Sequence, residues 1–186
     1  MRVLVIGHVD HGKTTFICAL NHFLFSRFGI GSAERSMPTV DEHNCVLSQE
    51  SVGFSVENID YTYVDYPGYA DYLDMFETGQ EKFDAALLVC AATDGPMSQT
   101  RSLFKKCLEY GIDKYVVYMS KTDIVEDEEL LEFTSDEVLF VMDEEGYSDK
   151  VAVVFGSADK VLTSSEDEAS DFIMDIIREV HKVCTR

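Results

Sequence analysis

The chain has 186 residues, of which 35 are acidic and 15 are basic, so its formal net charge is −20. This length is sufficient for a single domain with a substantial core. The negative charge argues against direct binding of tRNA or DNA and against attachment to an anionic membrane surface, because all of these partners are polyanions. Five scattered cysteines without a C-x-x-C pair, and no apolar stretch long enough to cross a bilayer, predict a cytoplasmic protein with reduced thiols.

A phosphate-binding motif follows the first predicted strand. The apolar run 3–6 predicts a buried strand, the run G-H-V-D-H-G-K-T-T fills residues 7–15, and the apolar spacing beyond it predicts a helix. This is the context in which G-x-x-x-x-G-K-[ST] surrounds nucleotide phosphates with backbone N–H groups. Lys13 would reach the β- and γ-phosphates, and the Thr14 hydroxyl would hold Mg²⁺. The predicted phosphate-loop residues are His8, Val9, Asp10, His11, Gly12, Lys13, Thr14 and Thr15.

Strand and helix patterns alternate through the rest of the chain. Residues 29–50 predict a long loop, since they show no clean periodicity. Further strands are predicted at residues 52–56, 59–64, 85–92, 115–119 and 151–155, with a tight turn at 57–58. Helices are predicted at residues 70–80, 98–110 and 126–144, and from a capping box at Ser165 and Glu168 toward Val183. This alternation predicts an α/β fold with a mainly parallel six-stranded sheet and helices on both faces.

Further loops at strand ends carry the chemistry that a nucleotide site needs. In a mainly parallel sheet, ligands bind beyond the carboxyl ends of the strands. Asp65 is, with Thr14, a predicted metal-site residue, whose carboxylate would also orient a Mg²⁺-bound water. The backbone N–H of Gly68 would reach the γ-phosphate. Asp123 would accept hydrogen bonds from N1 and N2 of guanine, a pair of donors that adenine lacks. The amides of Ser157 and Ala158 would face O6 of the base.

Five runs of residues together form one recognisable pattern. They are residues 7–15, D-Y-P-G-Y-A-D-Y at 65–72, A-A-T-D-G-P-M-S-Q-T-R at 91–101, S-K-T-D-I-V-E-D-E-E-L-L-E at 120–132 and G-S-A at 156–158. In these runs the chain resembles the GTPase domain of elongation factor Tu, in the translational GTPase family. The resemblance covers nearly the whole chain and implies a Ras-like P-loop GTPase that binds GTP or GDP with Mg²⁺ and hydrolyses GTP.

The resemblance also adds residues and partners to the predicted site. It implies that Ser120 and Lys121 belong to the nucleotide site, beside Asp123. It implies a monovalent cation near Asp10, and it makes Val9 part of an apolar gate over the attacking water. Guanine nucleotide is the implied ligand, and an exchange factor or a component of the translation machinery is the implied protein partner.

Three departures from the family pattern bear on activity. Tyr69 stands where the family has a histidine that positions the attacking water, and a phenol of pKa ~10 is a poor base at neutral pH. Ser120 replaces the asparagine of N-K-x-D, a loss of about 1–3 kcal/mol if nothing takes over its hydrogen bonds. The family's first-switch run R-G-I-T, whose threonine ligates Mg²⁺ when GTP is bound, is missing from residues 29–51. Thr39 is the sole threonine there, with Ser48 and Ser51 as weaker candidates. The predicted catalytic group is therefore Lys13, Gly68 and, in place of the histidine, Tyr69.

The sequence favours a guanine-nucleotide-binding protein that hydrolyses GTP slowly. We expect residues 1–186 to form a single GTPase domain, without the two β-barrel domains with which the family binds aminoacyl-tRNA. Two alternatives stay open. One is a catalytically impaired protein that holds nucleotide for stability or for a partner, and the other is an isolated GTPase-domain fragment of an elongation factor. Phosphate release, measured against a Lys13→Ala control, separates the slowly hydrolysing protein from the catalytically impaired one.

Overall fold

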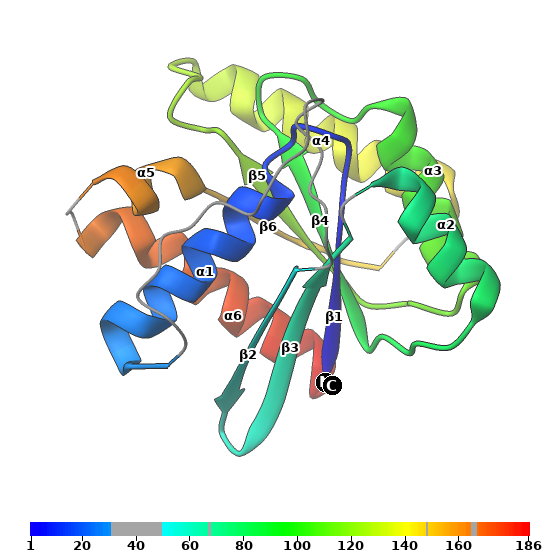
Figure 1. Cartoon of the computed structure of the whole chain (residues 1–186). Helices are drawn as coiled ribbons and strands as arrows, with labels where there is room; N and C mark the ends of the chain where they lie inside the picture. The colour runs from blue at the N-terminus through cyan, green and yellow to red at the C-terminus, as the bar shows by residue number, and fades with distance from the viewer. Residues whose placement is uncertain (31–49, 67, 148, 165–166) are drawn as a thin grey trace.

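A six-stranded sheet forms the centre of the computed structural model, which describes residues 1–30, 50–66, 68–147, 149–164 and 167–186 (Figure 1). The strand order is β2-β3-β1-β4-β5-β6, and only the pairing of β2 with β3 is antiparallel. The strands are β1 (Arg2–Ile6), β2 (Glu50–Val56), β3 (Ile59–Asp65), β4 (Ala85–Ala91), β5 (Tyr115–Ser120) and β6 (Ala152–Phe155). The predicted α/β class and mainly parallel six-stranded sheet are therefore confirmed.

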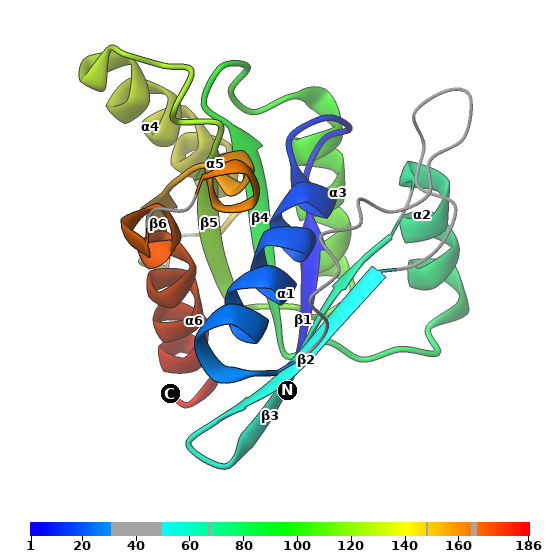
Figure 2. The same cartoon turned by 60° about the vertical axis from the view of Figure 1, so that its left-hand side comes forward.

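Helices cover both faces of this sheet, as predicted. The helices are α1 (Lys13–Phe28), α2 (Tyr69–Thr78), α3 (Ser98–Glu109), α4 (Glu128–Glu144), α5 (Ala158–Thr163) and α6 (Asp171–Cys184), with a 3₁₀ turn, η1 (Asp167–Ser170), before α6. Figure 2 shows α1 and α6 in front of the sheet and α3 behind it. Within the described residues, no helix has both the length and the apolar character that crossing a bilayer demands.

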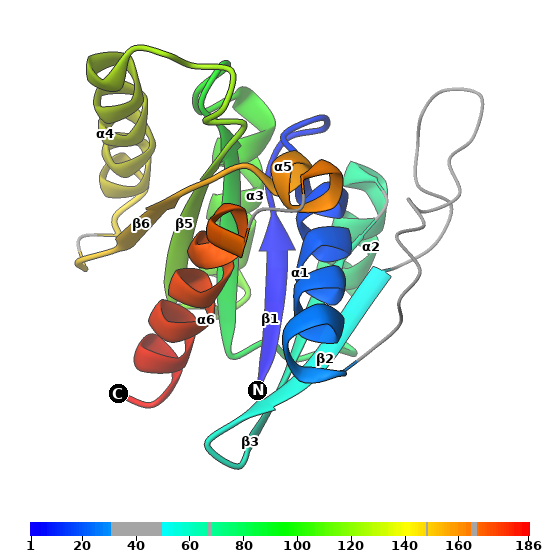
Figure 3. The same cartoon turned by 90° about the vertical axis from the view of Figure 1, so that its left-hand side faces the viewer.

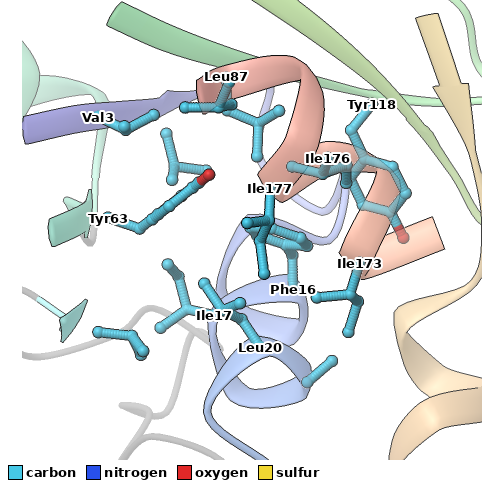
Figure 4. Close-up of a cluster of buried hydrophobic side chains, with 14 of the residues drawn as sticks. Val3, Phe16, Ile17, Leu20, Tyr63, Leu87, Tyr118, Ile173, Ile176 and Ile177 are labelled. Carbon is cyan, nitrogen blue, oxygen red and sulfur yellow. The ribbon is translucent and has the colours of Figure 1, made fainter. Parts of the chain in front are cut away.

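The alternation of side chains along each strand divides the core into two layers. In β1, Val3 and Val5 pack with α1 and α6, while Leu4 and Ile6 pack with α2, α3 and α4. Figure 4 shows the first layer, where side chains of α1 such as Phe16 face side chains of α6. A strand buried on both faces must be apolar at every position, which explains why the sequence signal of β1 and β4 is continuous.

The β2–β3 hairpin places the end of β3 at the same edge of the sheet as the end of β1. The two strands pair in register from Glu50 and Asp65 to Val56 and Ile59. Their predicted tight turn is confirmed, because Glu57 and Asn58 have φ values of 48° and 67°, as a type I′ hairpin turn requires. β3 then runs parallel to β1 and delivers its last residue, Asp65, beside the loop that follows β1.

The structure differs from the sequence predictions mainly near the carboxyl end of the chain. Helix α5 was not predicted, because six residues are too few to show a helical period. Helix α6 begins at Asp171, later than the predicted capping box, of which Ser165 lies outside the described residues. Helix α4 begins at Glu128, not at residue 126, because the Asp127 carboxylate accepts the N–H of Glu129 at 3.0 Å and caps the helix.

Most of the predicted long loop, with Thr39, lies outside the described residues. Helix α1 continues to Phe28 and ends at Gly29, which has a φ of 68°. Four of the five cysteines fall within the described residues, and none of these four forms a disulfide.

Candidate functional site

The predicted motif loops come together at one edge of the sheet. Strands β1, β3, β4, β5 and β6 are parallel, so their carboxyl ends share that edge. Figure 3 shows the loop between β1 and α1 at the upper end of β1, beside α5. Hydrogen bonds join neighbouring loops there: the Gly156 N–H donates to the carbonyl of Met119 at 3.1 Å, and the Ser120 hydroxyl donates to the carbonyl of His11 at 2.6 Å.

The loop from Gly7 to Gly12 has a conformation that demands glycine at both ends. Gly7 has a φ of 152°, and a Cβ atom added there would lie 2.2 Å from the carbonyl oxygen of Val89. Gly12 has a φ of 89° and forms the N-cap of α1. Asp10, at the exposed tip, also adopts a left-handed φ of 64°. The loop is thus a tight turn that leads into a helix N-terminus, which is the geometry of an anion site.

The Lys13 ammonium lies against this loop. Its Nζ donates to the carbonyls of Gly7 at 3.2 Å and His8 at 3.1 Å. Burial lowers the pKa of Lys13, and the negative charges of Asp65 and Asp10 act in the opposite direction. A desolvated ammonium gains more from an anionic neighbour than an exposed one does, because less water screens the pair. The loop therefore holds a positive charge where the sequence predicts phosphates.

A buried carboxylate stands next to the first turn of α1. Asp65 is only 2% exposed, and its Oδ2 accepts the hydroxyl proton of Thr14 at 2.7 Å. Burial raises the pKa of Asp65, while the Lys13 charge and hydrogen bonds from Thr14 and Tyr72 offset part of that rise. The two residues predicted to act on Mg²⁺ are thus in direct contact.

The donor set of Thr14 and Asp65 fits Mg²⁺ bound jointly with a nucleotide. A hydroxyl and a carboxylate are hard oxygen ligands, and Mg²⁺ usually takes one or two from the protein and the rest from phosphates and water. Within the described residues, no group of three or more His, Cys, Asp or Glu side chains could form an all-protein metal site. The hydroxyl and the carboxylate would therefore hold the ion only together with phosphate oxygens.

Ser120, which stands where the family has an asparagine, contacts the phosphate loop. Its side chain is 2% exposed, and its hydroxyl, besides the bond to His11, lies 3.4 Å from the carbonyl of Cys90. The hydroxyl thus joins the end of β5 to the phosphate loop. A side chain shorter than asparagine therefore forms a buried hydrogen bond to the phosphate loop at this position.

The loops predicted to hold the base lie around a hollow of about 380 Å³, a volume within the range of small-molecule sites. Among its lining residues are Asp123, Gly156, Ser157, Lys160 and Phe172. A Cβ atom at Gly156 would lie 2.3 Å from the Phe172 ring, so this wall requires glycine. A larger hollow of about 740 Å³ between β6 and α6 contains none of the predicted site residues, and size alone does not mark the site.

Two predicted residues have a different environment from the one expected. The Ala158 N–H, predicted to face the base, donates to the Tyr118 hydroxyl at 3.1 Å, inside the protein. Tyr69 is the first residue of α2 and packs, partly buried, against the core that α2 and α3 share. The Ser157 hydroxyl accepts the Lys160 N–H at 3.3 Å and caps α5. These contacts fix the positions of the loop after β6 and of the start of α2.

His11 lies buried in the phosphate loop, with 1% of its surface exposed. Its ring is edge-on to His8 at 5.2 Å between centroids, and its Nε2 is 3.9 Å from the nearest oxygen of Asp94. Burial, and to a lesser extent the neighbouring His8, lower the pKa of His11 to about 4, although Asp94 acts in the opposite direction. The imidazole is therefore neutral at neutral pH and adds no charge to the loop.

Tyr72 is the residue of this site that the sequence did not single out. Its hydroxyl lies 2.9 Å from Oδ1 of Asp65, on the opposite side of the carboxylate from Thr14. A tyrosine in an amphipathic helix predicts a core position, and the side chain is indeed buried. Only the packing of α2 against β3 shows that its polar end reaches Asp65.

The fold and this site together define a class of protein. A glycine loop between the first strand and the first helix of a mainly parallel sheet, with a lysine and a threonine opening that helix, is a P-loop nucleotide-binding domain. The family model of the elongation factor Tu GTP binding domain matches residues 1–182. The chain belongs to this family, so the predicted resemblance is confirmed, and membership supports GTP binding and GTPase activity in general.

Proposed function

We propose that this protein is a guanine-nucleotide switch that binds GTP and GDP with Mg²⁺ and hydrolyses GTP slowly. The observation that carries the proposal is the contact of Thr14 with Asp65, beside the Lys13 ammonium. Lys13 and Thr14 are the first two residues of α1, and Asp65 is the last residue of β3. The fold therefore brings charged and polar groups from two distant parts of the chain to one point. A cytoplasmic location and a protein partner, such as an exchange factor or a component of the translation machinery, accompany this proposal.

The chain's own residues would act mainly by positioning and by electrostatic stabilisation. Phosphoryl transfer requires little covalent chemistry from a protein, because most of the catalysis comes from holding phosphates and the attacking water in line. Backbone N–H groups of the loop and Lys13 would bind the β- and γ-phosphates, and the Gly68 N–H would orient the γ-phosphate. When bound, Mg²⁺ would neutralise phosphate charge, with Thr14 and Asp65 as its protein ligands. Asp123 would select guanine through N1 and N2.

The proposed slow rate rests on Tyr69. A phenol does not accept a proton readily at neutral pH, so it would not act as a general base for water. Tyr69 also packs against the core of α2 and α3, and that contact would compete with a position over the γ-phosphate. Both features reduce the ability of this residue to position a water molecule, whereas the phosphate loop and the predicted Mg²⁺ ligands are intact.

The packing of Tyr69 also favours a second candidate function. In that case the protein binds nucleotide and a partner but does not turn GTP over usefully. Because the binding residues are the same in both cases, affinity for GTP does not separate the two functions. The rate of phosphate release does.

Single-turnover phosphate release from preloaded GTP tests the proposal. We expect the parent protein to release phosphate measurably, but far more slowly than the roughly 1–20 per second of well-activated GTPases. Lys13→Ala should lose several kcal/mol of nucleotide affinity and all measurable turnover, since it removes a partly buried positive charge next to the phosphate loop. Lys106→Ala is the matched control, because Lys106 forms an ion pair with Glu109 on the exposed face of α3.

Two results would contradict this proposal. If Lys13→Ala binds GTP as the parent does, the loop is not a phosphate site. If the parent binds GTP tightly but releases no more phosphate than the Lys13→Ala background, the second candidate is correct.

A further inference from the structure

The Asp65 carboxylate is held from two sides. Its Oδ2 accepts the Thr14 hydroxyl at 2.7 Å, on the side of the phosphate loop. Its Oδ1 lies 2.9 Å from the hydroxyl of Tyr72, on the side of the core. Tyr72 is 1% exposed, and its hydroxyl also lies 2.6 Å from the carbonyl oxygen of Val5 in β1. One buried hydroxyl thus joins α2, the end of β3 and β1.

The position of this hydroxyl limits how the carboxylate can turn. A phenol has a single proton, and an ionised carboxylate is a stronger acceptor than a carbonyl, so the charged form of Asp65 attracts the Tyr72 proton. Rotation of the carboxylate would break this charge-assisted bond in a place where water does not replace it, because both residues are buried. The orientation that keeps the bond is also the one in which Oδ2 faces Thr14.

We propose that Tyr72 is a positioning residue for Mg²⁺, whose hydroxyl fixes the Asp65 carboxylate with Oδ2 toward Thr14 and the metal. This inference rests on the proposed function, since it takes Thr14 and Asp65 as the protein ligands of a nucleotide-bound Mg²⁺. Mutation of a residue that hydrogen-bonds to a metal ligand commonly lowers metal affinity by about 10- to 100-fold. Because Tyr72 lies in the first turn of α2, a displacement of that helix would change the affinity for Mg²⁺.

The test is the Mg²⁺ dependence of GDP binding in Tyr72→Phe, which removes the hydroxyl and keeps the ring. The dissociation constant of a fluorescent GDP is measured across a Mg²⁺ titration and in excess EDTA. We expect the Mg²⁺ concentration at the midpoint to rise about 10- to 100-fold, and the gain in affinity between EDTA and saturating Mg²⁺ to shrink. If the hydroxyl is merely structural, GDP affinity changes equally with and without Mg²⁺ and the midpoint stays at the parent value, which overturns the inference.

Tyr115→Phe is the matched control. Tyr115 is also 1% exposed, belongs to the same core layer as Tyr72, and its hydroxyl donates to the carbonyl of Ile112 at 2.7 Å. This variant loses an equally buried hydrogen bond without touching Asp65, so its Mg²⁺ midpoint should equal that of the parent. An equal shift in both variants would overturn the inference, because it would then report general loosening of the core.

A double-mutant cycle identifies the route of the effect. Asp65→Asn removes the proposed metal ligand, so adding Tyr72→Phe to it should change the Mg²⁺ dependence no further. An additional shift of the same size as in the single variant would show that Tyr72 acts by another route and would overturn the inference.

A second measurement needs no variant and keeps the test valid if Tyr72→Phe fails to fold. In the GDP-bound parent protein labelled with ¹³C at tyrosine Cζ, the Tyr72 resonance should move on addition of Mg²⁺ while that of Tyr115 stays in place. Equal responses of the two resonances would overturn the inference. A parent protein with no Mg²⁺-dependent GDP binding would overturn the proposed function itself, whereas a Mg²⁺-dependent parent with an unaltered Tyr72→Phe midpoint would overturn only this inference.

Discussion

The bridge from Ser120 to the phosphate loop predicts a measurable loss of stability in Ser120→Ala. The hydroxyl donates to the His11 carbonyl at 2.6 Å, and both residues are buried. Removing the donor leaves a buried carbonyl without this bond, which costs about 1–3 kcal/mol. In a domain of this size, each kcal/mol lowers Tm by about 2–4 °C. The same variant should bind GDP more weakly, because the phosphate loop is less firmly held. The dissociation constant should rise about tenfold for each 1.4 kcal/mol of binding free energy that is lost.

Urea unfolding without nucleotide, followed by a GDP titration, measures both effects. Ser135→Ala is the matched control, because Ser135 is also buried but its hydroxyl donates at 2.8 Å to Glu132 in its own helix, far in sequence from the loop. Its free energy of unfolding should change by less than about 0.5 kcal/mol, as alanine favours helices. If Ser120→Ala matches the parent in both measurements, the bridge contributes nothing and the reasoning is refuted.

Two further predictions concern Tyr69 and His11. Tyr69→His should increase the rate of single-turnover phosphate release, because it restores a proton acceptor. GDP affinity should stay within about threefold of the parent, because the phosphate loop is unaltered. An unchanged rate would mean that another departure, first of all the missing switch threonine, limits hydrolysis. Burial lowers the pKa of His11 from its ordinary value of 6.5 to about 4, so the unfolded chain binds the proton first as the pH falls. The stability from the neutral ring is complete above pH 6.5 and is lost as the pH falls toward 4, up to roughly 3 kcal/mol. His11→Gln should lack this component in urea unfolding at several pH values, and equal pH profiles for parent and variant would argue against a buried neutral imidazole.

The sequence predicted those features of the fold that local patterns determine. The run from Val3 to Ile6 is apolar at every position because β1 is buried on both faces, and that continuity is visible without a structure. The turn at Glu57 and Asn58 was predicted from turn chemistry, since asparagine tolerates the positive φ found there. The location of Asp65 and Ser120 at the same edge of the sheet was predictable, because both end strands that run parallel to β1.

Features that depend on packing between distant elements were beyond prediction. The bond from Tyr72 to Asp65 depends on which side of α2 faces β3, and the sequence indicates only that the tyrosine is on a core face. The bond from Ser120 to the His11 carbonyl depends on how closely the phosphate loop approaches the end of β5, a distance that no local pattern encodes. Helix α5 was missed, and the start of α6 was predicted too early, because helix boundaries rest on a few capping contacts.

Nucleotide selectivity tests the central claim most directly. Fluorescent GDP bound to the parent protein is displaced by unlabelled GDP, ADP or XDP, and the same competition is repeated with Asp123→Asn. We expect GDP to compete better than ADP by a factor on the order of 10⁴, because ADP would leave the carboxylate of Asp123 without its two donors. Asp123→Asn should shift the preference toward XDP. Equal competition by GDP and ADP in the parent protein would contradict the assignment of this sheet edge as a guanine-nucleotide site.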